Sequence, residues 1–430
     1  MIGIVVSTAD EASVNIGEEL RSIERWETVE EGVFRRDGFE LREFEDLHLN
    51  LTGVASSFSD PEYVVVASRH SGETGPLLSA HFTGNFGNAE YGGSDRELST
   101  PCPGALSRVL EALDANAPPE YDVCMECTHH GPTDFGTPGL FVELGSGEEQ
   151  WRDRAGARAV AKSILELEDV GPETDRTLVG FGGNHYASKA TRIVRETEFG
   201  MGHVAADWSL DAMGDPVDNR DLLESMFEKS TATCAVLDGD YPELEAVIRE
   251  LGYRIVGERW VRETSGVDPS LLSDLEVALG SVGDGLRFGD VDPDGGSFLV
   301  IDLPKELIEE CQGIDRGATL DAIAKSTIAF QTRENGNRVG ERAAVGDREA
   351  YDRFVESCLS ILEREYEVVR REGETIHAER STFDPDRAAD LGVPEGPKFG
   401  MLASGEPVSV DGETIYPEEV ETRENRQFSV

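Results

Sequence analysis

The chain has 430 residues and a formal net charge of −47, because 86 acidic residues stand against 39 basic ones. This length excludes a single small module and suits two domains. The acidic residues are spread over the whole chain and 38% of its residues are hydrophobic, which excludes a disordered acidic protein. We interpret the composition as that of a folded protein adapted to a very salty cytoplasm, where charge repulsion is screened. The alternative is an acidic protein from a cell of ordinary ionic strength.

The first 262 residues alternate between apolar runs and helical patterns, which predict strands and helices respectively. We expect strands at 2–7, 63–68, 121–127, 139–144, 177–181, 233–237 and 254–256. We expect helices at 13–25, 101–113, 148–167 and 243–251. Strands that alternate with helices predict an α/β domain with a mostly parallel or mixed sheet flanked by helices.

The remaining residues, 265–430, differ in texture from the first part. They have breaks rich in glycine and aspartate, and helical patterns near 305–311 and 348–371. We therefore place a domain boundary near residue 265. The chain is predicted to consist of a catalytic domain, 1–262, and a smaller C-terminal α+β region of unknown role, 265–430.

The stretch from 121 to 151 combines a buried strand, a polar loop and a second strand. The first strand leads Glu126, Thr128, His129 and His130 into a loop that is rich in glycine and proline. In α/β enzymes, loops at strand ends hold the chemistry. Histidine titrates near neutral pH and is a common metal ligand, so the adjacent histidines are the strongest candidates for a reacting centre.

Acid-free stretches are informative in so acidic a chain. They are residues 74–89 with His81, 127–133 with His129 and His130, 177–195 with His185, and 199–206 with His203. Several of them are rich in Gly, Asn and Thr rather than in apolar residues, so we expect loops that converge on one cleft with a polar, anionic ligand. The alternative is a set of unrelated tight turns.

Three other patterns have ordinary explanations. Cys124 and Cys127 have the spacing of half a zinc site, but no second pair completes it. The glycines of 180–183 are only a fragment of a phosphate-binding turn. We interpret the three remaining histidines as ordinary core or surface residues; they are His48, His70 and His377.

Several segments carry a family resemblance in the same order along the chain. They are IGIVVSTADEAS (2–13), HFTGNFG (81–87), MECTHHGPT (125–133), TPGLFVELGSGEEQW (137–151), GFGGNHYASKAT (180–191) and GMGHVAADW (200–208). Together they resemble the archaeal and plant type of D-aminoacyl-tRNA deacylase, over about residues 1–260. The resemblance implies a fold like that of peptidyl-tRNA hydrolases and nucleoside phosphorylases, with zinc as a cofactor. It also implies hydrolysis of the ester that joins a D-amino acid to tRNA, so that mischarged tRNA is recycled and D-amino acid toxicity is avoided.

Ester hydrolysis requires a base for water and a group that stabilises the oxyanion. The predicted catalytic residues are His129, His130, Glu126, His185 and Lys189. The predicted substrate-binding residues are His81, Phe82, Asn85, Thr128, Gly182, Gly183, Asn184, Tyr186 and Arg192. The predicted zinc ligands are His130, His185 and His203, with His81 as a further candidate.

Two other functions stay open on the sequence. A phosphorylase-like enzyme acting on nucleosides or nucleotides would bind phosphate at Gly182 and Gly183 and would need free phosphate for activity. A non-catalytic tRNA-binding protein would bind tRNA without turnover. We expect D-aminoacyl-tRNA as the partner, neither a membrane nor DNA, and a monomer or weak dimer. The chain shows no signal peptide and no apolar run that could span a bilayer, so we expect a cytoplasmic protein with reduced cysteines.

Overall fold

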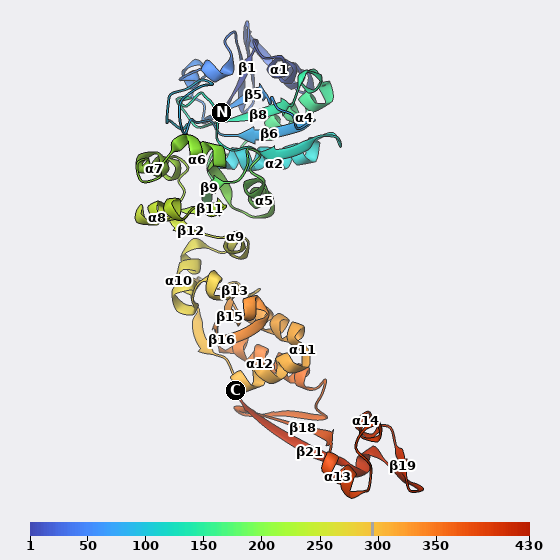
Figure 1. The fold of residues 1–430 in the computed structure, drawn as a ribbon. Helices are drawn as coiled ribbons and strands as arrows, with labels where there is room; N and C mark the ends of the chain where they lie inside the picture. The colour runs from blue at the N-terminus through green and yellow to red at the C-terminus, as the bar shows by residue number, and fades with distance from the viewer. Residues whose placement is uncertain (294–295) are drawn as a thin grey trace. The chain divides into compact units, whose positions relative to one another are not determined.

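The computed structural model describes residues 1–293 and 296–430. They form two compact units, Met1–Gly266 and Val267–Val430 (Figure 1). The division lies beside the predicted boundary at residue 265. That residues 1–262 form a catalytic domain separate from residues 265–430 stays a prediction. Among the described residues, no helix is both long enough and apolar enough to cross a membrane.

The larger sheet of the N-terminal unit has the strand order β2-β3-β4-β1-β5-β8-β6-β7. Its strands are β1 (Ile2–Ser7), β2 (Glu27–Glu30), β3 (Val33–Arg36), β4 (Phe39–Phe44), β5 (Tyr63–Arg69), β6 (Leu77–His81), β7 (Asp122–Met125) and β8 (Gly139–Gly145). Strand β1 is parallel to β4 and β5, and β5 is parallel to β8, whereas β6 is antiparallel to β8. The predicted mixed α/β sheet is confirmed.

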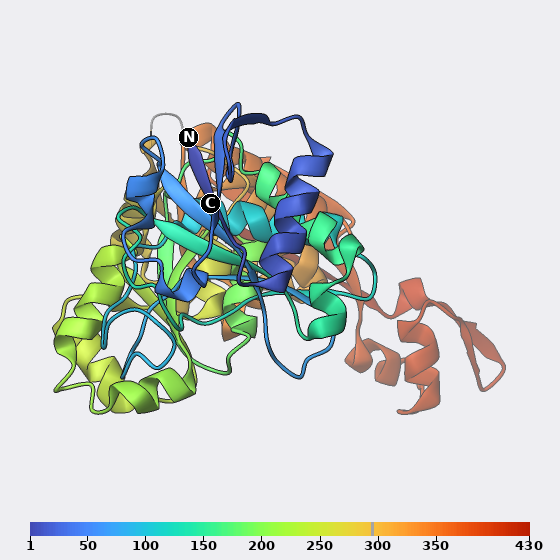
Figure 2. The ribbon, with the colours of Figure 1, turned by 90° about the horizontal axis from the view of Figure 1, so that it is seen from above.

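Helices cover one face of this sheet (Figures 1 and 2). They are α1 (Glu11–Ile23), α2 (Pro103–Asn116), α3 (Glu148–Trp151) and α4 (Arg154–Leu165). Helix α4 packs between α1 and α2. The prediction of one helix over 148–167 was wrong, because the Asp153 side chain accepts hydrogen bonds from the backbone N–H groups of Ala155 and Gly156 and so begins a new helix.

A smaller parallel sheet completes the N-terminal unit, with the order β10-β9-β11-β12. Its elements are β9 (Thr177–Gly182), α5 (Ser188–Glu196), β10 (Gly200–Ala205), α6 (Asp207–Met213), α7 (Arg220–Lys229), β11 (Cys234–Asp238), α8 (Pro242–Glu250), β12 (Arg254–Ile255) and α9 (Glu258–Thr264). The backbone after β7 joins the two sheets, because the N–H of Thr128 donates to the carbonyl of Val204 at 2.8 Å and that of Cys127 to His185 at 2.8 Å. These bonds carry the loop after β7 into the site.

The C-terminal unit is α+β, as predicted. It contains α10 (Pro269–Leu279), β13 (Leu286–Phe288), β14 (Leu299–Asp302), α11 (Lys305–Ser326), β15 (Ala329–Arg333), β16 (Arg338–Val345), α12 (Arg348–Leu362), β17 (Val368–Glu372), β18 (Thr375–Phe383), α13 (Pro385–Asp390), α14 (Pro397–Ala403), β19 (Val408–Val410), β20 (Glu413–Ile415) and β21 (Glu421–Ser429). Helix α11 packs against α12. The predicted helix 348–371 was too long, because α12 ends at Leu362 and its last predicted residues form β17, which pairs with β18.

Candidate active site

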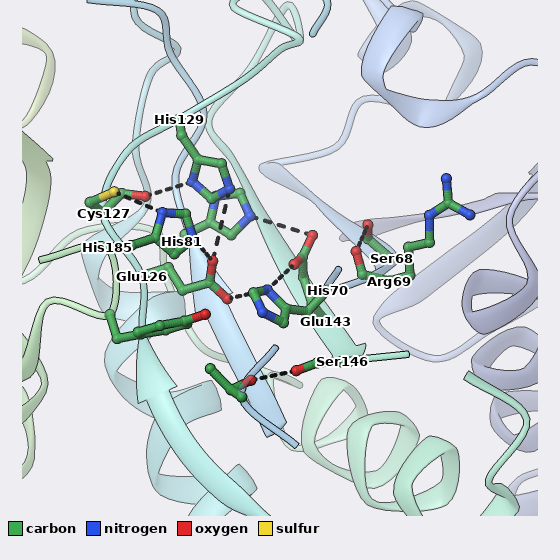
Figure 3. A network of polar contacts seen from close by, with 12 residues as sticks. Ser68, Arg69, His70, His81, Glu126, Cys127, His129, Glu143, Ser146 and His185 are labelled. Atoms are coloured by element: carbon green, nitrogen blue, oxygen red, sulfur yellow. Dashed lines mark hydrogen bonds and ion pairs between the residues drawn. The ribbon is translucent and has the colours of Figure 1, made fainter. Parts of the chain in front are cut away.

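Four polar side chains meet on the face of the larger sheet that is turned away from the helices (Figure 3). They are His70, His81, Glu126 and Glu143. A side chain on Gly156 of α4 would touch Leu144, so Leu144 points towards α4 and its neighbour Glu143 points to the opposite face. The register of β6 on β8 places His81 opposite Phe141, on the same face as Glu143. His70 directly follows β5, and Glu126 directly follows β7.

The four side chains form a buried ionic cluster. His70 Nδ1 lies 3.0 Å from Glu126 Oε1 and 3.7 Å from Glu143 Oε2. His81 Nε2 lies 3.4 Å from Glu143 Oε1. All four residues are buried, so the two carboxylates depend on the histidines for the stabilisation that water would otherwise give.

The loop histidines complete the cluster, and Figure 3 shows His129 and His185 beside Glu126. His185 Nε2 lies 2.7 Å from Glu126 Oε2, and His129 Nε2 lies 3.8 Å from the same oxygen. The His129 ring stacks on that of His81, with centroids 4.2 Å apart, and the His130 ring lies 4.8 Å from it. The structure therefore brings together His81, Glu126, His129, His130 and His185, so three of the four acid-free stretches that were predicted to converge contribute a histidine to the cluster.

Burial and neighbouring charges shift the pKa values of these groups, upwards for some and downwards for others. Burial opposes ionisation of Glu126, but hydrogen bonds from His185 and His70 outweigh it and hold the carboxyl pKa well below its usual range. Burial lowers the pKa of His70, but Glu126 and Glu143 outweigh it and raise the pKa to about 10. Burial, aided by charge on His81, lowers the pKa of His129 well below its ordinary value and that of His130 to about 3. At neutral pH the last two imidazoles are neutral, the form that binds metal ions.

The cluster opens into a cavity of about 810 Å³. Its lining includes His70, His129, His130, Glu143 and His185. This volume lies in the range of pockets that enclose small-molecule ligands. A ligand in the cavity thus meets the histidines directly.

Three of the histidines have the same hydrogen-bond arrangement. The Nδ1 atoms of His81, His129 and His130 lie 3.0, 2.9 and 2.7 Å from the main-chain carbonyl oxygens of Phe82, Cys127 and Gly131. A carbonyl oxygen only accepts, so each Nδ1 carries a proton. The Nε2 atoms of the neutral His129 and His130 offer lone pairs, and that of His81 offers one when the proton that Glu143 favours there is absent. Ligand atoms of these three residues lie within 4.8 Å of one another, and the buried His81 Nε2 faces Glu143 Oε1 at 3.4 Å without a hydrogen bond of good geometry. This donor set fits a metal ion whose ligands are oriented by outer hydrogen bonds.

Two further residue groups have metal-binding geometry among the described residues. They are Cys127, His129 and His185, and His70, Glu126 and His185. Burial and the nearby Glu126 raise the pKa of the Cys127 thiol to about 12, which disfavours the thiolate that metals bind. His185 Nε2 already engages Glu126. The group of three histidines is therefore the better candidate.

The predicted ligand trio His130, His185 and His203 is not brought together. His203 is buried with Nε2 2.9 Å from the Ser99 carbonyl oxygen and Nδ1 3.0 Å from the Thr128 hydroxyl oxygen. Both ring nitrogens are thus occupied, and burial lowers the pKa of His203 to about 4. His203 supports the protein core beside the site, and Thr128 is its partner rather than a residue of the cavity lining.

The predicted cationic and glycine residues have other partners as well. Lys189 Nζ lies 2.7 Å from the Leu237 carbonyl oxygen and 3.0 Å from Asp238 Oδ1. Arg192 forms a two-pronged ion pair with Glu258, with both N–O distances 2.7 Å. Both cations are thus held by acceptors of the chain itself. Gly182 and Gly183 pack closely against Tyr241 and Asp238, which a side chain at either glycine would strike.

The other predicted binding residues lie around the cavity in different roles. Asn85 lines it and holds its own loop by donating to the Gly92 carbonyl at 2.9 Å. Tyr186 lies beside the site, with its ring 5.9 Å from that of His70. Phe82 is buried, and Asn184 accepts a hydrogen bond from the backbone of Tyr186 at 3.0 Å.

Two residues of the cluster were missed. His70 was interpreted as an ordinary histidine, and this interpretation was wrong because the residue binds both carboxylates. Glu143 was not considered, although a lone acid within the apolar run GLFVELG is a signal of a buried, paired charge.

Comparison with known proteins gives a consistent result. A family model described as D-aminoacyl-tRNA deacylase matches residues 57–256. Curated proteins named D-aminoacyl-tRNA deacylase are similar over the whole chain, with 48% identity to that of Natronomonas pharaonis (100% of both chains) and 49% to that of Halobacterium salinarum (100% of this chain, 95% of the relative). Residues 265–430 are therefore shared with these relatives.

More distant relatives extend the likeness. The protein of that name from Methanoregula boonei is 31% identical over 86% of each chain. A crystal structure described as a conserved protein of unknown function is 28% identical, with a TM-score of 0.57, and covers 62% of this chain and 98% of its own. On the full-length similarity and the family model together, the chain belongs to the D-aminoacyl-tRNA deacylase family.

Proposed function

We propose that this protein hydrolyses the ester bond of D-aminoacyl-tRNA at the histidine–glutamate cluster. Family membership supports the reaction, which releases a free D-amino acid and tRNA. The observation that carries the site is the buried Glu126 held between His70 and His185, two residues that line a cavity of about 810 Å³. An ester-hydrolysing site needs such an oriented imidazole beside an open space for substrate.

His185 is the proposed base. Its Nε2–H donates to the ionised Glu126 at 2.7 Å, so the carboxylate fixes the tautomer and stabilises the imidazolium. Nδ1 then faces Cys127 Sγ at 3.6 Å, a weak contact with a thiol that stays protonated. His185 takes a proton from water at Nδ1 and returns it to the ribose oxygen that leaves the acyl carbon. His129, first predicted as a base, becomes a metal ligand in this proposal, and His130, first predicted in both roles, keeps that of a ligand.

A zinc ion is the proposed cofactor, held by Nε2 of His81, His129 and His130. Imidazole nitrogen suits zinc, and the carboxylate of Glu143 that favours a proton on His81 favours a cation at the same place. Zinc in such a site would polarise the ester carbonyl and lower the pKa of water. The chain's own part is to keep the three Nε2 lone pairs aligned through the Nδ1–H bonds to the backbone.

The test is a deacylation assay on matched D- and L-aminoacyl-tRNA at molar salt, with zinc content measured on the same samples. We expect release of the D-amino acid, its loss after a chelator removes zinc, and its return when zinc is restored. Intact D-aminoacyl-tRNA after incubation with zinc-loaded protein would overturn the function. Full activity with no bound metal would overturn the zinc proposal alone.

A further inference from the structure

Two aromatic side chains of the N-terminal unit are strongly exposed, and both border the same cavity. Tyr91 is 68% exposed and Trp208 is 47% exposed. Both residues line the cavity that contains His129, His130 and His185. No other aromatic residue among the described residues of Met1–Gly266 is as exposed as these two. Large exposed rings at a concave site indicate a ligand that covers them.

Tyr91 is fixed to the loop of the paired histidines. Its carbonyl accepts a hydrogen bond from the N–H of Gly131 at 2.9 Å, and Gly84 N–H donates to the His130 carbonyl at 2.8 Å. Gly92 has a φ of +81°, and a side chain there would strike the Leu49 carbonyl. The backbone that carries Tyr91 is therefore held in one position relative to His130.

Trp208 is held beside the proposed base by a different element, α6. It lies in the first turn of α6, which the N–H of Asp207 ties to the Gly183 carbonyl at 2.9 Å. The Trp208 ring lies near the His185 ring and roughly parallel to it, with centroids 6.4 Å apart and an angle of 27° between the planes. A side chain on Gly87, in the loop of Tyr91, would lie 3.0 Å from the Ala212 carbonyl of α6. The loop that carries Tyr91 therefore packs against the helix that carries Trp208.

From this arrangement we propose that Trp208 and Tyr91 bind the terminal nucleobase of the tRNA 3′ end by stacking on its faces. Stacked in this way, the base holds its ribose ester beside His185. The inference rests on the proposed function, because it assigns the nucleotide end of that same substrate. Two rings on the walls of a concave site suit a planar ligand rather than a flat protein surface.

The charge of the protein strengthens this inference. Phosphate contacts by cations weaken steeply with salt, and a chain of −47 repels a polyanion wherever screening is incomplete. Arg69, a cation of the cavity lining, is already 3.3 Å from the buried Asp10. Stacking of a base on an aromatic ring releases no counterions, so, unlike phosphate contacts, it supplies recognition in the salt that the composition indicates.

The test compares two substrates that differ only in the base. One is the D-aminoacyl ester of adenosine, and the other is the same D-aminoacyl ester of a base-free ribose. Trp208→Ala and Tyr91→Ala should each raise KM for the adenosine ester by about 5- to 150-fold, the range for one stacked base, with a much smaller effect on kcat. The loss for the base-free ester should be at least about fivefold smaller.

Three controls separate the outcomes. Trp208→Phe and Tyr91→Phe should recover most of the lost affinity, because a ring remains, and Tyr416→Ala, an exposed aromatic residue of the C-terminal unit, should change nothing. Equal losses on both esters would show a structural role and overturn the inference, as would unchanged KM in both alanine variants. A protein that hydrolyses neither ester and also leaves D-aminoacyl-tRNA intact would overturn the proposed function instead, whereas hydrolysis of D-aminoacyl-tRNA without hydrolysis of the adenosine ester would contradict the inference.

A binding measurement tests the inference without catalysis. Adenosine 5′-monophosphate should quench the Trp208 part of the fluorescence, and ribose 5-phosphate should not. The part assigned to Trp208 is the difference between the wild type and Trp208→Phe, since the chain has four tryptophans. Equal quenching in both proteins would contradict stacking on Trp208.

Discussion

Replacement of Glu126 by glutamine is the sharpest perturbation of the site. Glutamine keeps the volume but removes the charge that binds His70 at 3.0 Å and His185 at 2.7 Å. Loss of the carboxylate that orients a catalytic imidazole, together with an altered tautomer, predicts a fall of about 10²–10⁴-fold in the rate of deacylation. The buried His70 loses its nearest counter-ion, so the free energy of unfolding should fall by about 1–3 kcal/mol.

The assay is single-turnover deacylation of D-aminoacyl-tRNA at molar salt, with a denaturant unfolding curve on the same protein. Glu258→Gln is the matched control, because that carboxylate pairs with Arg192 outside the cavity lining. It should lose at most about 1 kcal/mol and keep its rate. If Glu126→Gln retains more than about a third of the wild-type rate, well short of the loss expected for an acid–base group, the assignment of Glu126 and His185 is refuted.

Three further predictions concern the buried His203, the buried Glu40 and the net charge. His203→Ala should lower the free energy of unfolding by about 2–4 kcal/mol, through lost hydrogen bonds and a cavity, yet leave zinc content unchanged; loss of zinc would make His203 a ligand after all. Arg42 and Arg35 lower the pKa of the buried Glu40 below its ordinary 4.5, so its stabilisation is present above that pH and disappears as pH falls through the lower folded value. Glu40→Gln should therefore flatten the acid side of a plot of unfolding midpoint against pH, and a parallel curve would contradict this. Finally, the wild type should unfold and lose activity in roughly 50 mM salt, where repulsion at −47 is little screened, and stable full activity there would refute the halophilic interpretation.

Local patterns predicted much of the fold. Apolar runs located β1, β5, β8 and β9 because buried strands need little besides their own side chains to be recognised. The errors arose where a helix cap or a strand pairing ended a helix earlier than its apolar pattern predicted. Asp153 begins a new helix inside 148–167, and residues 368–371 pair with β18 instead of extending α12.

The candidate site was predicted only in part, because long-range strand pairing brings some of its residues together. Residue type and the absence of nearby acids pointed to His129, His130 and His185. These signals are local in the sequence and do not depend on how the strands pair. His70 and Glu143 acquire their role only when β5, β8 and β6 lie side by side, a long-range pairing that no local pattern contains. Lys189 and Arg192 show the converse, because a positive charge in the sequence does not reveal the acid that already binds it.

The most direct test of the account compares the wild type with His185→Gln on matched D- and L-aminoacyl-tRNA in molar salt. Rate, zinc content and melting midpoint are measured on the same samples. The account predicts that the wild type releases the D-amino acid, and that His185→Gln does so about 10²–10⁴-fold more slowly with zinc content and midpoint unchanged. A His185→Gln protein that deacylates D-aminoacyl-tRNA within about threefold of the wild-type rate, far less than a catalytic base contributes, would contradict it.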